Sequence, residues 1–123
     1  MVLNKNMALL SVIFYTLFLT VLSLMPIDEE IPRFGFSFDD KIYHLFAYFI
    51  FTVLLYTYTT AVQIKRKILV AFSIAVIYGI IIEVLQGTLG NKRTSEVYDV
   101  IANVSGSLIG VLVILSMRKL KLK

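Results

Sequence analysis

Three short segments of the sequence carry polar residues three or four positions apart inside otherwise apolar stretches. The segments are DKIYHLFAY, EVLQ and DVIANVSG, and their polar side chains include Asp40, Lys41, His44, Tyr48, Glu83, Gln86, Asp99 and Asn103. Residues with this spacing share one face of a helix. Imidazole and carboxylate groups transfer protons, and amide and hydroxyl groups form directional hydrogen bonds. These segments are therefore the candidates for catalysis or ligand binding.

The elements that must position these side chains are predicted to be membrane-spanning helices. Of the 123 residues, 59% are hydrophobic, whereas about 45–50% is usual in a soluble domain. The apolar residues fall into four runs, at about 7–25, 42–62, 68–89 and 97–117. Each run is long enough to cross about 30 Å of hydrocarbon as a helix. The sequence therefore predicts one all-α domain over 1–123, an integral membrane four-helix bundle.

The composition disfavours several other classes. The chain has no cysteine, so it offers no disulfide and no thiolate metal site, and we expect no metal and no cofactor. The net charge of +4 comes from basic residues at the ends of the apolar runs, which favours membrane anchoring over nucleic-acid binding. The runs lack the alternation of a transmembrane barrel. The first run is longer than a usual signal-peptide core, so we interpret it as a retained helix.

The basic residues also predict the orientation. Eight Lys and Arg residues lie in the N-terminal tail, the loop at 63–67 and the C-terminal tail, whereas four lie in the other two loops. The positive-inside rule then places both termini and the 63–67 loop in the cytoplasm. In this orientation the candidate polar residues fall toward the outer side. We therefore expect a multi-pass protein of the bacterial cytoplasmic membrane with a polar site near the outer leaflet.

The depth of the polar residues predicts that they meet. Glu83 and Asn103 each lie six residues inside the outer end of a run, about 9 Å deep, and Tyr48 lies about 10 Å deep. We expect a cavity between the last three helices at this level, with Glu83 as its central member. The residues expected to converge there are His44, Glu83, Arg93, Asp99 and Asn103.

Small residues predict how the helices pack. A stripe of small residues leads up to Gly79 and Glu83 on the third run, and another follows Asn103 through Gly106 on the fourth. Small residues four apart let helices approach closely in a membrane. We therefore expect the third and fourth helices to pack on these faces, with Glu83 facing Asn103 and with Ile114 in contact with lipid.

Each polar residue also has a purely structural interpretation. An ionisable group inside a span costs about 2.5–3.5 kcal/mol on insertion scales and is a functional candidate by default. Even so, Asp40 and Lys41 could mark the water boundary, and His44 could pair with Asp40. Glu83 and Asn103 could be hydrogen-bond partners that hold helices together. Both interpretations stay open at the level of sequence.

The ordered set of motifs resembles the VanZ-like family of small bacterial membrane proteins. The pattern reads D-K-x-x-H-x-x-x-Y, E-x-x-Q, an Arg six residues before an Asp, and N-x-x-G-x-x-x-G, and it spans about residues 39–110. Members often carry a Pro-Gly-Arg-like turn before the Asp, whereas this chain has GNKR. The family is named for a glycopeptide-resistance accessory protein linked to teicoplanin. The matching positions are Asp40, Lys41, His44, Tyr48, Glu83, Gln86, Arg93, Asp99, Asn103, Gly106 and Gly110.

The resemblance and the spacing lead to two function classes. In the first, the protein acts on or binds a cell-envelope lipid, a lipid-linked cell-wall precursor or a glycopeptide-related ligand, as a monomer or an oligomer. In the second, it is a membrane-embedded acid–base enzyme on a lipid-linked cell-wall substrate, with His44, Glu83 and Asp99 as catalytic candidates. A transporter is disfavoured because no inverted repeat is apparent. The expected ligand-binding residues are Asp40, Lys41, His44, Tyr48, Glu83, Gln86, Arg93, Asp99 and Asn103.

The orientation can be tested with single cysteines. A cysteine at Ser37 should react with a membrane-impermeant thiol reagent in whole cells, whereas one at Gln63 should react only after permeabilisation. The reason is the excess of basic residues around the 63–67 loop. Labelling of the Gln63 position in intact cells would reverse the orientation and with it the outward-facing site.

Overall fold

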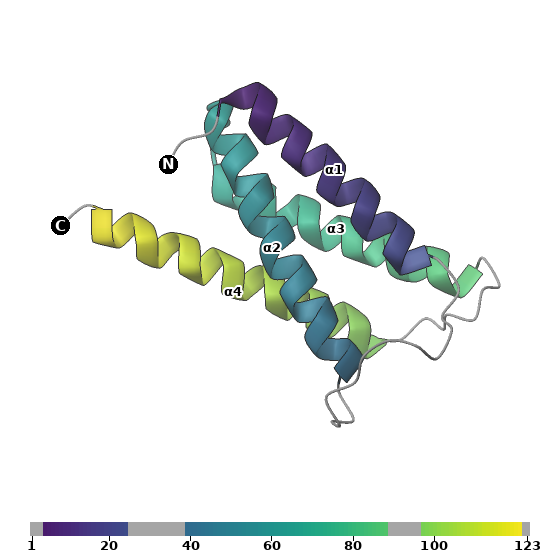
Figure 1. The fold of residues 1–123 in the computed structure, drawn as a ribbon. Helices are drawn as coiled ribbons and strands as arrows, with labels where there is room; N and C mark the ends of the chain where they lie inside the picture. The colour runs from purple at the N-terminus through teal and green to yellow at the C-terminus, as the bar shows by residue number, and fades with distance from the viewer. Residues whose placement is uncertain (1–3, 25–38, 89–96, 122–123) are drawn as a thin grey trace.

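The structure consists of four α-helices that follow one another along the chain (Figure 1). The computed structural model describes residues 4–24, 39–88 and 97–121. The helices are α1 (Lys5–Leu24), α2 (Asp39–Ala61), α3 (Lys67–Thr88) and α4 (Val97–Lys121). All four are long and apolar enough to cross a membrane. The prediction of an all-α bundle of four membrane-spanning helices is therefore confirmed.

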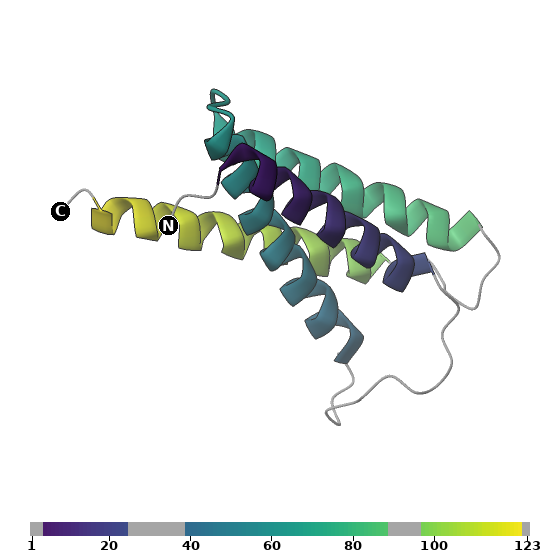
Figure 2. The same cartoon turned by 45° about the horizontal axis from the view of Figure 1, so that its top comes forward.

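The ends of the helices gather at two ends of the bundle (Figures 1 and 2). The end where α2 and α4 begin carries Lys41 and Asp99 and is called the polar end below. The opposite end, where α1 begins and α4 ends, is called the basic end. Its basic residues in the described helices and the α2–α3 turn are Lys5, Lys65, Arg66, Lys67, Arg118, Lys119 and Lys121. Which end faces the cytoplasm stays a prediction.

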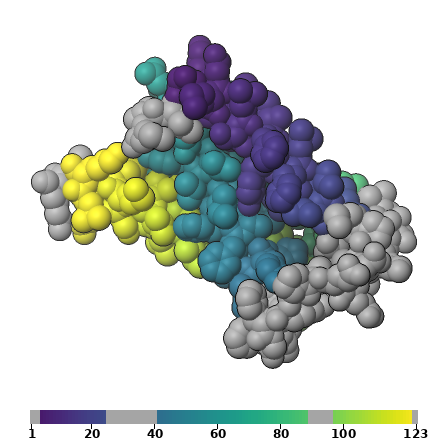
Figure 3. Space-filling model, in the orientation of Figure 1, coloured from purple at the N-terminus to yellow at the C-terminus, as the bar shows by residue number. Residues whose placement is uncertain are grey.

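α2 is the central helix of the bundle. It packs against each of the other three helices, and its contact with α4 is the most extensive in the described structure. Because α2 and α4 both start at the polar end, they run in the same direction. The last turns of α4 extend past the other helices (Figure 3). The pairing of α2 with α4 therefore decides which residues meet at the polar end.

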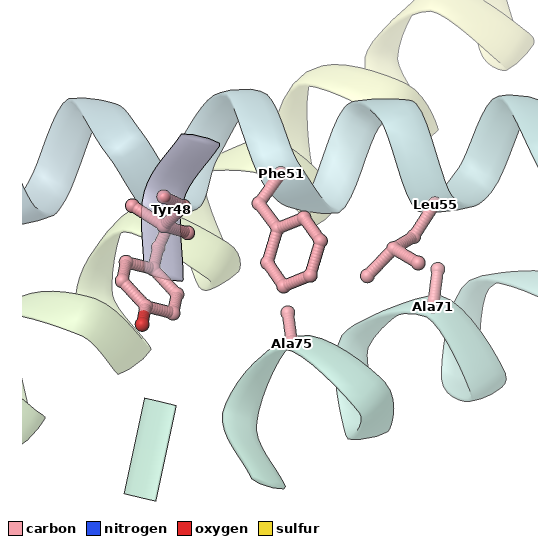
Figure 4. Packing of buried hydrophobic residues seen from close by; sticks show 6 residues of the cluster. Tyr48, Phe51, Leu55, Ala71 and Ala75 are labelled. Atoms are coloured by element: carbon pink, nitrogen blue, oxygen red, sulfur yellow. The ribbon is translucent and has the colours of Figure 1, made fainter. Parts of the chain in front are cut away.

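Large side chains of α2 pack on small residues of α3. Phe51 and Leu55 lie over Ala75 and Ala71, all of them buried (Figure 4). The Phe51 ring also makes an edge contact with the Tyr78 ring, at 5.1 Å between centroids. Alanines four residues apart leave room for such rings, so the two helices come close together. This contact fixes α3 beside α2.

The glycines of α4 pack on α2, which corrects the expected contact of Gly106 with α3. A Cβ atom at Gly106 would collide with the backbone carbonyl oxygen of Leu45. A Cβ at Gly110 would lie 3.3 Å from the carbonyl oxygen of Phe49 and from Cβ of Thr52. The expectation was wrong because a spacing of four identifies a narrow helix face but not the helix that packs against it.

Gly79 of α3 meets both neighbouring helices. A Cβ at this position would lie 3.0 Å from Cε2 of Tyr48 on α2 and 3.2 Å from Nδ2 of Asn103 on α4. The position is a three-helix contact rather than a contact of Gly79 with Gly106.

Ile114 corrects a second expectation, because its side chain is 5% exposed and does not face lipid. It lies four residues after Gly110 and continues the packed stripe.

α1 is attached to the bundle through hydroxyl groups. Tyr15 donates a hydrogen bond to the backbone carbonyl of Ala47 on α2, at 2.5 Å. The hydroxyls of Thr20 and Tyr78 form a hydrogen bond between α1 and α3. The opposite face of α1 carries exposed Leu10, Phe14 and Leu17, the composition expected of a lipid-facing surface.

Replacing Gly106 with Ala should destabilise the protein by about 1–3 kcal/mol, because the added methyl group overlaps the α2 backbone. Thermal unfolding in mild detergent measures this effect. Gly87, exposed near the end of α3, provides a matched control: the same substitution there should leave stability unchanged or slightly raised. Equal melting temperatures for the two variants would contradict a close α2–α4 contact at Gly106.

Candidate functional site

Four polar residues meet where α2 and α4 begin. Lys41 and His44 lie three residues apart on α2, and Asp99 and Asn103 lie four residues apart on α4. Each spacing places the two side chains of one helix on the same face. Because the two helices run in the same direction, these faces meet at the same level. We call these four residues the α2–α4 polar cluster.

An ion pair joins the two helices at the edge of the cluster. Lys41 Nζ lies 2.7 Å from Asp99 Oδ1, and the two side chains are 17% and 9% exposed. Asp99 lies in the first turn of α4, where the partial positive charge of the helix N-terminus stabilises a carboxylate. The ammonium group and the helix N-terminus therefore both place positive charge beside the Asp99 carboxylate.

The His44 ring lies between the two cluster residues of α4, Asp99 and Asn103. Its Nδ1 lies 3.0 Å from Asn103 Oδ1, and its Nε2 lies 3.6 Å from Asp99 Oδ1. With the amide oxygen turned to the ring, Nδ1–H donates the hydrogen bond to Asn103. A second proton on Nε2 would give an imidazolium whose positive charge faces the Asp99 carboxylate. The ring thus lies against α4, with a hydrogen bond to Asn103.

Two buried donors lie one turn deeper than His44. The side chains of Tyr48 and Asn103 are each 2% exposed. The Tyr48 ring edge and the Asn103 amide nitrogen both lie close to Gly79, at 3.0 and 3.2 Å from its Cβ position. Within the described part of the chain, neither the Tyr48 hydroxyl nor the Asn103 amide nitrogen has a hydrogen-bond partner. Such groups are costly inside a membrane.

Glu83 approaches the same level from α3. Its side chain is 3% exposed, and it lies one turn after Gly79 on the same face of the helix. The carboxylate is close enough to the Tyr48 hydroxyl for an electrostatic interaction. The structure therefore brings Glu83 toward the middle of the bundle.

Gln86 has a different partner. Its side-chain amide donates a hydrogen bond to the backbone carbonyl of Ser23 on α1, at 2.8 Å. This bond ties the last turn of α1 to α3. Arg93 and the side chain of Asp40 lie outside the described residues. Their predicted roles therefore stay predictions.

The polar stripe continues inward beyond the residues that the sequence singled out. Thr52 lies four residues after Tyr48, and Ser107 lies four residues after Asn103. Both side chains are fully buried. Their hydroxyl oxygens form no hydrogen bond with the residues described here. The signal that could have identified them is the same spacing of four, extended by one more turn.

Two hollows in the described part of the chain lie away from the predicted site residues. Both lie toward the basic end, one around the α2–α3 turn and one between α3 and α4. The cavity expected between the last three helices at the polar end stays a prediction. Among residues 4–24, 39–88 and 97–121, no group of three or more His, Asp or Glu residues could hold a metal ion. The cluster is therefore best described as hydrogen-bonding groups and charges at a helix interface.

A comparison with family models identifies the chain. The VanZ/LLP1 family model matches residues 5–118, which include all four helices except the last residues of α4. The chain belongs to the VanZ/LLP1 family. This membership and the four apolar helices establish a VanZ-like multi-pass membrane protein. The comparisons with curated proteins and with solved structures gave no match.

The ion pair of this VanZ/LLP1-family protein can be tested with a double-mutant cycle. Lys41→Met and Asp99→Asn should each lower stability, and the loss in the double variant should be smaller than the sum of the two. Residues in one ion pair typically show a coupling energy of about 0.5–3 kcal/mol. The measurement is thermal unfolding in detergent.

Lys121→Met combined with Asp99→Asn serves as the control, because Lys121 lies at the basic end. These two substitutions should have additive effects. Additivity of Lys41→Met with Asp99→Asn would show that the pair contributes nothing to the α2–α4 contact.

Proposed function

We propose that the protein binds the polar head group of a cell-envelope lipid at the polar end of α2 and α4. The observation that carries the proposal is a pair of buried groups, the amide nitrogen of Asn103 in the cluster and the hydroxyl of Tyr48 next to it. Buried polar groups are nearly always hydrogen-bonded, so groups without a protein partner are candidates for contact with a ligand.

The chemistry of these groups supports an acceptor-rich ligand. The Asn103 amide nitrogen donates hydrogen bonds, and the Tyr48 hydroxyl can also donate. Lys41 at the rim adds a positive charge, which Asp99 balances in part. Phosphate and sugar oxygens of a lipid head group accept hydrogen bonds from such donors. A lipid is favoured over a soluble ligand because the groups belong to membrane-spanning helices.

The acid–base enzyme is the second candidate, and the geometry supports it less. A general base needs a nitrogen or oxygen atom within hydrogen-bond reach of the substrate. His44 faces Asn103 with one ring nitrogen and Asp99 with the other. Nδ1 would have to leave Asn103 before it could exchange a proton with a substrate, and Nε2 faces the Asp99 carboxylate. Binding without catalysis requires no such change.

The proposal predicts that a bound lipid is lost when the Tyr48 hydroxyl is removed. Lipids that co-purify with the protein in mild detergent are identified by mass spectrometry. Tyr48→Phe should lower the retained amount of one envelope lipid about fivefold, the effect of losing a hydrogen bond of about 1 kcal/mol. Tyr98→Phe is the matched control, because Tyr98 lies on α4 at the same end with an exposed side chain.

Glu83→Gln separates a charge that serves binding from one that only holds helices together. It keeps the shape of the side chain, so the variant should insert and fold normally and yet lose the same lipid. Equal lipid content in wild type, Tyr48→Phe and Glu83→Gln would reject the proposal in favour of a structural cluster. Turnover of an added lipid-linked precursor would favour the enzyme, and retention of teicoplanin in place of a lipid would favour a glycopeptide ligand.

A further inference from the structure

A basic pocket lies at the end of the bundle opposite to the polar cluster. It has a volume of about 350 Å³ and is formed by the α2–α3 turn, the start of α3 and the end of α4. Arg66 lies in the turn with φ 56°, in the left-handed region. Four of the seven lining residues are cations contributed by two separate parts of the chain. The lining residues are Ile64, Lys65, Arg66, Lys67, Ile68, Leu69 and Arg118.

The cations of this pocket have no carboxylate nearby on the helices that form it. The sequence contains no Asp or Glu between residues 41 and 82 or after Asp99. The described residues show no ion pair to any of the four cations. Several cations around one hollow repel one another unless an anion lies among them. The pocket is therefore suited to a group with negative charge, such as a phosphate.

An apolar groove continues from the basic pocket along α3 and α4. Its volume is about 390 Å³, and Ile68 and Leu69 line both the groove and the pocket. On α4, residues 108, 111 and 115 line the groove and lead at helical spacing to Arg118. The groove thus begins at the cations and runs toward the middle of the bundle. The groove-lining residues are Ile68, Leu69, Phe72, Leu108, Val111 and Leu115.

We propose that these two hollows together form a binding site for an anionic phospholipid. The phosphate lies among Lys65, Lys67 and Arg118, and one acyl chain lies in the groove between α3 and α4. Each volume falls within the range of about 300–1,000 Å³ that is typical of ligand sites. Clusters of Lys and Arg beside a membrane-spanning helix attract anionic lipids. Only a lipid carries both the charge that fits the pocket and the chain that fits the groove.

The site is tested with delipidated protein in detergent, titrated with lipids of matched acyl chains and observed by native mass spectrometry. Phosphatidylglycerol should bind more tightly than phosphatidylcholine. The double variant Lys65→Gln with Arg118→Gln should bind phosphatidylglycerol about twenty-five-fold more weakly, since each basic residue near an anionic lipid contributes about fivefold. The matched control, Lys5→Gln with Lys121→Gln, removes the same charge from the same end outside the pocket and should change binding little.

The groove and the lipid source are tested in the same assay. Val111→Phe, which fills the groove, should weaken phosphatidylglycerol binding, whereas Leu112→Phe on the exposed face of α4 should not. Glycerol 3-phosphate should bind far more weakly than the lipid. The proposal is overturned if both double variants lose affinity equally, because the charge then acts only as a diffuse surface. It is also overturned if glycerol 3-phosphate binds as tightly as the lipid.

Discussion

The absence of water in the membrane interior is the constraint on which this bundle depends. A charge or amide in that region needs a partner within the protein. The beginning of α2 brings Lys41 and His44, and α4 brings Asp99 and Asn103 as their partners. The partners meet only because α4 has Gly106 where the α2 backbone passes. The glycine contact and the polar cluster therefore depend on each other.

The other two helices are fixed by interactions that follow from the α2–α4 pair. α3 fits against α2 with alanines beneath large side chains, and Gly79 fits against Tyr48 and Asn103. α1 contributes few buried residues to the core. In a membrane, burial of apolar surface gives little drive to associate, because lipid tails are equally apolar. Hydrogen bonds therefore take over the role of apolar burial in fixing α1. Tyr15, Tyr78 and Gln86 form these bonds between α1 and its neighbours.

The sequence predicted the elements of the structure better than their pairing. The four spans follow from the length of the apolar runs, and the family follows from the ordered motifs, so both could be predicted. The spacing of Gly106 identified a packing face, but nothing in the spacing separates α2 from α3 as the partner. Ile114 is a residue type common at lipid-facing positions, but it is buried because it lies on the same face of α4 as Gly106. Thr52 and Ser107 were missed because an uncharged hydroxyl in a membrane span is a weaker indication of function than an ionisable group.

The pairing of α2 with α4 has a consequence for biogenesis. α2 has the lowest mean hydropathy of the four spans, and its strongest partner is the last one to be synthesised. The ribosome must first complete α3, a delay on the order of seconds at about 5–20 residues per second. During that interval Lys41 and His44 have been synthesised, whereas Asp99 and Asn103 have not. The polar cluster between α2 and α4 can therefore form only after α4 has been synthesised, so it is among the last contacts of the bundle to be completed.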